Sequence, residues 1–145
     1  QMLMHVRGPD GGTLLLKDGV LTKQDILDFA AVGPTARASG VDIDVRRDDP
    51  YAAYPLVNWK VITAEAGDVF AKAEVRLLEM YESISIIEQC LAGLKKEKEG
   101  EIDVKVKYIP VGYGTGHAEA PRGEVFHFVV SDAFVSMSII QMWRN

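Results

Sequence analysis

The feature that most constrains the fold is a stripe of apolar side chains in residues 68–98. Apolar residues recur there every three or four positions, which is the period of an amphipathic helix. Asp68 opens the segment and lysines close it before Gly100, as the helix dipole favours. The sequence therefore predicts one long helix from Asp68 to about Lys98. The stripe consists of Phe70, Ala73, Leu77, Met80 or Tyr81, Ile84, Ile87, Leu91 and Leu94.

A helix of that length would be about 45 Å long, since each residue adds about 1.5 Å. A globular domain of 145 residues is narrower than this. Two interpretations are open. Part of the stripe contacts another chain or domain, or the helix frays after Leu91.

Shorter elements precede the long helix. Residues 13–17 form an apolar segment typical of a strand and are followed by turn residues. Thr22 is suited to cap a short helix, with Asp25 in the first turn, where a negative charge is favourable. Gly33 and Pro34 predict the end of that helix, because proline cannot continue one.

The strands predicted after residue 55 complete the fold class. Residues 58–65 are rich in β-branched and aromatic side chains, and residues 102–108 alternate between apolar and polar. Residues 111–121 are expected to be a glycine-rich connection, and residues 124–130 a central strand, because both faces are apolar. The sequence thus predicts a single α+β domain over residues 1–145, with a small, mostly antiparallel sheet packed on one long helix.

Composition excludes several classes of protein. The net charge is −5, with 16 basic and 21 acidic side chains, so the chain lacks the excess of Lys and Arg that nucleic-acid binding requires. Cys90 is the single cysteine, which excludes an internal disulfide and a multi-cysteine metal site built from this chain alone. We therefore expect no metal ligands and no nucleic-acid partner.

Most of the tempting motifs have ordinary explanations. The glycines of residues 112–116 follow a predicted strand, but no helix comes after them, as a phosphate-binding loop requires. His127 falls in the predicted central strand, where a hydrogen-bonded core histidine is the expected interpretation. His117 lies beside Glu119, so an exposed acid–base pair and an ordinary loop histidine are both open.

Residues 33–55 show no helical or strand period, and loops of that length inside a domain are usually functional. Their alternating carboxylates and guanidinium groups suit a buried ion network, because arginine forms bidentate bonds that hold a loop rigid. A solvated polar loop is the alternative, and residue types alone do not distinguish the two. The polar residues in question are Arg37, Ser39, Asp42, Asp44, Arg46, Arg47, Asp48, Asp49 and Tyr51.

The second segment of interest is Glu-Ala-Pro-Arg-Gly-Glu at residues 119–124. Pro121 and its small neighbours would fix the guanidinium of Arg122 at the end of a strand, from where it could face a cleft. An exposed turn arginine is the alternative.

Three motifs in order resemble one known family: GVLTKQDILDFAAVGPTARASGVDIDVRRDDPYAAY, then GDVFAKAEVRLLEMYESISIIEQCL, then GHAEAPRGEVFHFVVSD. The chain resembles the large subunit of membrane-bound, energy-converting nickel–iron hydrogenases of the hydrogenase-3 and formate hydrogenlyase type. The quinone-site subunit of complex I (NADH:quinone oxidoreductase) is homologous to that subunit. The resemblance covers residues 20–132, and the tail from residue 133 departs from it.

The resemblance implies part of a hydrogenase-large-subunit-like fold and an oxidoreductase function. In that family two Cys-x-x-Cys pairs hold the nickel–iron centre, and this chain has neither pair. It would therefore be the central part of such a subunit, supplying scaffold around the metal and inactive alone. The alternatives are a quinone-reducing subunit of the NADH dehydrogenase type, with quinone in place of nickel and iron, and a non-catalytic binding or structural module.

The resemblance also implies site residues and partners. The family's arginine in Ala-Pro-Arg-Gly lies over the metal, so Arg122 and Pro121 are the expected residues around the ligands. Complex I relatives often carry Lys there, so Arg122 favours the hydrogenase branch. Expected partners are an iron–sulfur small subunit and membrane-arm subunits, on the cytoplasmic face of the inner membrane, and the isolated chain is expected to self-associate. Weaker cofactor-binding candidates are Arg37, Asp42, Arg46, Asp49, His117 and Glu119.

Overall fold

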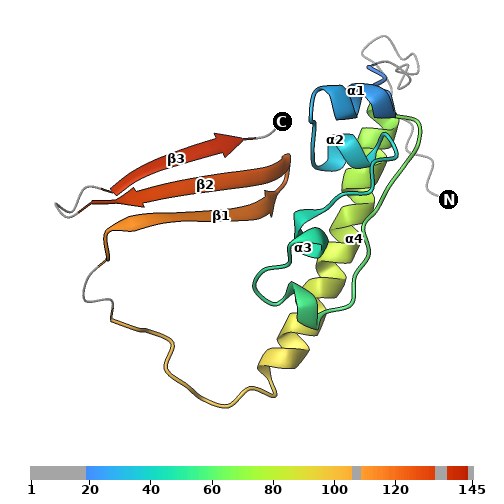
Figure 1. The fold of residues 1–145 in the computed structure, drawn as a ribbon. Coiled ribbons are helices and arrows are strands. Elements are labelled where there is room, and N and C mark those ends of the chain that lie inside the picture. Colours follow the sequence, from blue (N-terminus) through green and yellow to red (C-terminus); the bar gives the residue numbers. More distant parts are fainter. Residues whose placement is uncertain (1–18, 106–108, 133–136, 144–145) are drawn as a thin grey trace, which may run out of the picture.

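A layer of helices stands beside a three-stranded antiparallel sheet in the computed structural model, which describes residues 19–105, 109–132 and 137–143 (Figure 1). The predicted α+β class is confirmed, while the strand predicted at residues 13–17 lies outside the described residues. The helical layer consists of α1 (Lys23–Asp28), α2 (Pro34–Arg37), α3 (Val45–Asp48), the 3-10 helix η1 (Tyr54–Leu56) and α4 (Val69–Leu94), and the sheet of β1 (Gly112–Ala120), β2 (Gly123–Ser131) and β3 (Met137–Trp143).

The long helix α4 begins where the sequence predicts. The Asp68 carboxylate accepts a hydrogen bond of 2.8 Å from the Ala71 backbone N–H, which caps the helix. The helix continues past Leu91, so the alternative of fraying there is wrong, but it ends at Leu94, short of the predicted end at about Lys98. Along its length α4 buries only small or medium side chains, Ala71 and Val75, against Ala38 of the helical layer.

The apolar stripe of α4 faces away from the described chain over most of its length. Ile84 and Leu94 are 52% and 67% exposed, and neighbouring stripe residues are similarly open. Close packing through Ala71 and Val75 directs a narrow face of the helix inward and leaves the larger side chains outside. Within the described part of the chain most of the stripe is left uncovered, and its contact with another chain or domain stays a prediction. No helix in the described ranges is both long and apolar enough to cross a bilayer.

The short helices before α4 follow the prediction at their start, but residues 33–55 are more regular than predicted. Thr22 and Asp25 form a reciprocal capping box at the start of α1, which confirms the predicted cap. Gly33, however, serves as the N-cap of α2 in a positive-φ conformation, with Pro34 in its first turn. Helices α2 and α3 have four residues each, so neither is long enough to show a period in the sequence.

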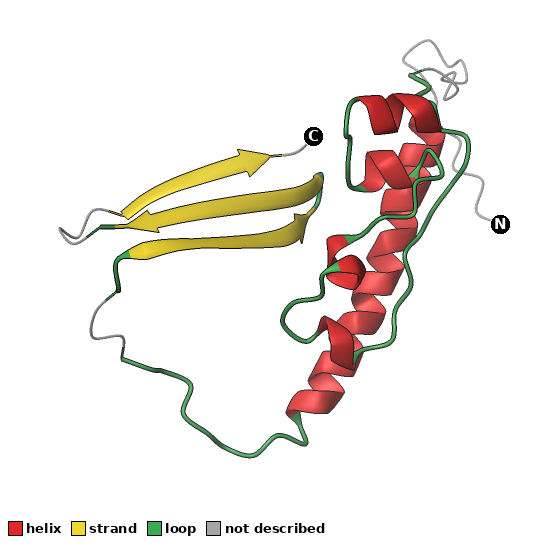
Figure 2. Cartoon of the chain, viewed as in Figure 1, coloured by secondary structure: helices red, strands yellow, loops and turns green. Residues whose placement is uncertain are grey.

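Residues 58–65 are extended but form no strand in the structure, so that prediction is wrong. The segment runs along α4, as Figure 2 shows, and α4 side chains take the place of a neighbouring strand. The Gln89 amide accepts from the Asn58 N–H at 2.8 Å and donates to the Asn58 carbonyl at 2.7 Å. Glu82 accepts from the Lys60 N–H at 3.2 Å.

Strand β2 lies at the centre of the sheet, as predicted for residues 124–130. The predicted connection at residues 111–121 is instead strand β1, paired with β2 from Gly112 opposite Ser131 to Ala120 opposite Gly123. Glycines without side chains to pack hid this strand from the sequence pattern. Residues 102–105 form no strand and are exposed, which contradicts the prediction there, and residues 106–108 lie outside the described ranges.

The sheet meets the helical layer at its β1–β2 end, where Pro121 and Arg122 make a two-residue turn (Figure 1). A Cβ on Gly33 would lie 2.4 Å from the Gly123 Cα, so the two backbones touch there. Only a residue without a side chain permits this approach.

We expect the isolated 145-residue chain to self-associate through the exposed stripe of α4, since an uncovered apolar helix face favours association in water. Light scattering at micromolar concentrations should give a mass above the 16.0 kDa of one chain. Ile84→Glu should shift the mass towards one chain, whereas Thr63→Glu, which adds the same charge at an exposed position off the stripe, should not. A single-chain mass for the unaltered protein at all concentrations would refute this expectation.

Candidate functional site at the turn between β1 and β2

A buried arginine organises the junction between helices and sheet. Arg37, on the last turn of α2, is 1% exposed. Its Nε donates to Glu79 on α4 at 2.7 Å, its Nη2 to Glu119 on β1 at 2.9 Å, and its Nη1 to the Ile43 carbonyl at 3.1 Å. Nη1 also lies 3.2 Å from the Asp44 carboxylate, which caps α3. One guanidinium thus joins α2, α4, the start of α3 and β1.

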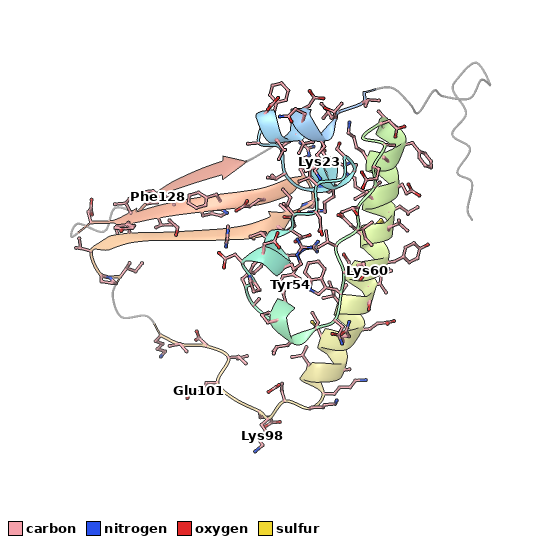
Figure 3. All side chains as sticks on the ribbon, turned by 45° about the vertical axis from the view of Figure 1, so that its right-hand side comes forward. Lys23, Tyr54, Lys60, Lys98, Glu101 and Phe128 are labelled. Carbon is pink, nitrogen blue, oxygen red and sulfur yellow. The ribbon has the colours of Figure 1, made fainter. Side chains whose placement is uncertain are left out.

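Asp44 carries a second arginine. Its fully buried carboxylate accepts from Nε and Nη2 of Arg46 at 2.8 and 2.6 Å, a bidentate pair. The Arg46 guanidinium also lies 4.7 Å from the Trp59 ring centre, a cation–π distance. The hydrogen bonds to Asp44 raise the pKa of Arg46. Figure 3 shows the neighbouring Tyr54 side chain in this part of the molecule, beside α4.

The remaining charges of this segment are solvated. Arg47 bonds the exposed carboxylates of Asp42 and Asp48 at 2.6 and 2.7 Å, and its side chain is 41% exposed. The hydrogen bond from Arg47 lowers the pKa of Asp48. Residues 33–55 therefore combine the two interpretations, a buried ion network and a solvated polar loop, for different side chains. Arg37 and Arg46 lie in a buried network, whereas Asp42 is part of a surface pair.

The buried network has an unequal number of charges. We call it the Arg37 cluster: three carboxylates, Asp44, Glu79 and Glu119, with two guanidiniums, Arg37 and Arg46. Burial raises the pKa of Glu119, although the charge and hydrogen bond of Arg37 act in the opposite direction. The folded protein therefore holds a proton on Glu119 more tightly than the unfolded chain does.

Tyr51 fixes the backbone of β1 at the same residue. Strand β1 is at the edge of the sheet, and the Glu119 N–H donates to the Tyr51 hydroxyl at 2.9 Å. Burial raises the pKa of Tyr51, so this phenol stays neutral around pH 7. The Tyr51 ring packs edge-on against Tyr54 at 5.1 Å.

The histidines differ from the sequence expectations. His117 lies in β1, not in a loop, with Nε2 3.0 Å from Asp49 and Nδ1 3.1 Å from Glu124. The acid–base pair with Glu119, one of the two open interpretations, is not formed, because Glu119 binds Arg37. His127 is only half-buried in β2.

Two cavities lie beside the β1–β2 turn, and Pro121 and Arg122 line different ones. One, of about 400 Å³, is lined by the Arg37 side of the cluster together with Glu119 and Pro121. The other, of about 420 Å³, is lined by Arg122 with apolar residues that include Ile26 and Phe29. Arg76 of α4 lines both. The exposed Arg122 thus faces a different cavity from the one beside Pro121, and sequence reasoning did not single out Arg76 because nothing near it in the chain marks it.

The residues present do not fit a nickel–iron centre. Within the described ranges, no group of three His, Cys, Asp or Glu side chains is placed to hold a metal. Cys90, the single thiol, is half-buried on α4. Such a centre needs thiolates, and the side chains around the turn are guanidinium and carboxylate groups. These groups hold the β1–β2 turn, and with it the guanidinium of Arg122, in place.

Comparison with known proteins identifies the family. The sequence profile described as "Respiratory-chain NADH dehydrogenase, 49 Kd subunit" matches residues 16–111. The chain belongs to this family. The complex I side of the expected resemblance is therefore confirmed, and α1, residues 33–55 and α4 all fall within the match.

Individual 49 kDa family relatives agree. An F(420)H(2) dehydrogenase subunit of Methanosarcina mazei is 42% identical over 120 residues, and an NADH-quinone oxidoreductase subunit of Herpetosiphon aurantiacus is 39% identical over 118. Each alignment covers 79% of this chain and 32% of the relative. A chain in the structure of the membrane-bound sulfane sulfur reductase, an archaeal respiratory membrane complex, matches with a TM-score of 0.72 and 32% identity, over 79% of this chain and 33% of that one. The chain thus spans about a third of the length of the proteins it matches.

Arg37→Ala should destabilise the protein by about 3–5 kcal/mol, because it leaves buried carboxylates without their cation. Arg47→Ala removes an exposed guanidinium with two carboxylate partners and should cost less than about 1 kcal/mol. Urea denaturation of both variants measures the difference. Equal losses would show that the Arg37 cluster contributes no more than a surface pair.

The contribution of Glu119 to the stability of the folded chain should fall as the pH rises above the ordinary glutamate value of 4.5. A raised pKa in the folded state means that the folded protein holds the Glu119 proton more tightly than the unfolded chain does. The resulting stabilisation is complete below the unfolded pKa and is lost as the pH rises through the folded one. Glu119→Gln should flatten this part of the pH–stability curve, measured by urea denaturation, and an unchanged slope would contradict the assignment.

Proposed function

We propose that this chain forms the middle third of the redox subunit of a membrane-bound respiratory oxidoreductase. Membership of the 49 kDa family and the match to a respiratory membrane complex support this. Its role there is to supply scaffold and a fixed cationic surround for a redox site that the remainder of the subunit completes.

The observation that carries the proposal is the attachment of the Ala-Pro-Arg-Gly turn to the helical layer. The turn is held through Glu119 and the Arg37 cluster, and it presents Arg122 at an open cavity with apolar walls. A guanidinium in that position can orient a polar or anionic group by directed hydrogen bonds and stabilise negative charge that develops on it. Pro121 stiffens the turn that carries it.

Within this family the dehydrogenase branch is the better supported. The relatives are named as NADH-quinone oxidoreductase and F(420)H(2) dehydrogenase subunits. We therefore propose that electrons pass through the assembled subunit towards a quinone-type acceptor, from a partner that carries iron–sulfur clusters, in the peripheral arm of a membrane complex on the cytoplasmic side.

A nickel–iron hydrogenase of the energy-converting type is the second candidate. Arg122 favours it, since complex I relatives often carry Lys at this place in the resemblance. The nickel–iron centre would supply hydrogen binding, and its thiolates would have to come from outside this chain. Purified intact complex distinguishes the two candidates: quinone reduction without nickel supports the first, and hydrogen evolution with stoichiometric nickel supports the second. Neither activity would leave a non-catalytic structural module.

Replacing Arg122 should lower turnover without unfolding the protein, because the side chain is exposed at the turn. In the intact complex, Arg122→Ala should reduce kcat by about tenfold or more, in the range seen for residues around a redox centre. Arg122→Lys should keep most activity in the dehydrogenase branch and lose it in the hydrogenase branch. Arg47→Ala, an exposed arginine away from the turn, is the matched control and should stay near the unaltered rate. Unchanged turnover in Arg122→Ala would remove Arg122 from the site.

A further inference from the structure

The Pro121–Arg122 turn is fixed from the helical layer at several points close together. The Gly33 backbone touches it directly, since a Cβ on Gly33 would lie 2.7 Å from the Arg122 carbonyl oxygen. At residue 119 the backbone N–H donates to Tyr51 at 2.9 Å, and the carboxylate binds Arg37 at 2.9 Å. Glu119 is thus held by both its backbone and its side chain, three residues before Arg122.

These attachments are confined to one end of the sheet. In β1 the residues from Gly112 to Gly116 are exposed, and only the four from His117 onwards are partly covered. His117 adds its contact with Asp49 next to α3. The hydrogen bonds and ion pair described between β1 and the helical layer therefore lie close to the turn.

Arg37 is suited to be the fixed side of this attachment. Three of its contacts, to Glu79, the Ile43 carbonyl and Asp44, involve only the helical layer. They set the plane of the guanidinium independently of the sheet. The remaining nitrogen, Nη2, donates one hydrogen bond to Glu119, and because the guanidinium is planar and already fixed, the direction of this bond is set by the helical layer.

We propose that Arg37 is a positioning residue for Arg122. Through Glu119 it holds the β1–β2 turn at one place on the helical layer, so that the Arg122 guanidinium is presented at the cavity lined by Phe29 and Arg76. The functional part of this inference rests on the proposed function, in which Arg122 serves a redox site.

The test compares two variants in the intact subunit within its complex. Glu119→Ala removes the carboxylate that connects Arg37 to the turn, whereas Glu88→Ala removes an exposed carboxylate of α4 that lies outside the Arg37 cluster. For Glu119→Ala we expect faster amide hydrogen exchange over residues 119–124 and a fall in kcat of about tenfold, with KM within about twofold. Glu88→Ala should leave exchange at the turn unchanged and kcat within about twofold. Glu119→Gln, which keeps an acceptor for Arg37, should recover most of the lost rate.

A double variant separates positioning from an independent role. If Glu119 acts through Arg122, adding Glu119→Ala to Arg122→Ala should cause no further loss of kcat. Multiplied losses would overturn the inference. Equal amide exchange at the turn in Glu119→Ala and in the unaltered protein would also overturn the inference, whatever the turnover. Amide exchange can be measured even if the variant is partly unstable.

Failure of the proposed function gives a different result. Unchanged turnover in Arg122→Ala would refute a role for Arg122 at a redox site. Faster exchange in Glu119→Ala would in that case support Arg37 as the anchor of the turn, without a catalytic consequence.

Discussion

The buried guanidinium of Arg37 is the interaction on which the arrangement of this molecule depends. It contacts an element from each part of the fold: the cap of α3, the middle of α4 and the end of β1. A charge at 1% exposure is tolerated only when its donors are all satisfied, and here each guanidinium nitrogen has an acceptor. Among the described residues the apolar core consists of small clusters around Ile26 and Val75, so the ion network specifies much of the geometry there.

The burial of the Arg37 cluster gives the junction a second property. Burial, and to a smaller extent the charge of Asp44, raises the pKa of Glu119, the residue that links the helices to the sheet. The group that binds the turn is thus also the group whose charge responds to its surroundings. Tyr51 keeps the backbone of that residue in place whichever form the carboxyl takes, because it binds the N–H and not the side chain.

Much of the fold was predictable from local rules. The cap and course of α4, the capping box at Thr22 and the central position of β2 follow from period, capping chemistry and apolar pattern. Strand β1 was missed because its glycines carry no pattern, and residues 58–65 were misassigned because Gln89 and Glu82 replace a strand partner. At the site, the sequence suggested Arg37, Arg46 and Glu119 without their partners. Which ions are buried depends on contacts between residues up to 82 positions apart, which no local pattern records.

The described residues between α4 and β1 contribute little to the packing of the molecule. Residues 95–105 and 109–111 are exposed, and Figure 3 shows Lys98 and Glu101 on a path well away from the other side chains. The entropy of closing such a loop changes slowly with its length, by about 0.6 kcal/mol for each doubling. Residues could be inserted there, or the chain cut, while the hairpin stays docked through its turn. The helical layer and the sheet therefore behave as one unit held together by their contacts, and the peptide that connects them acts as a tether.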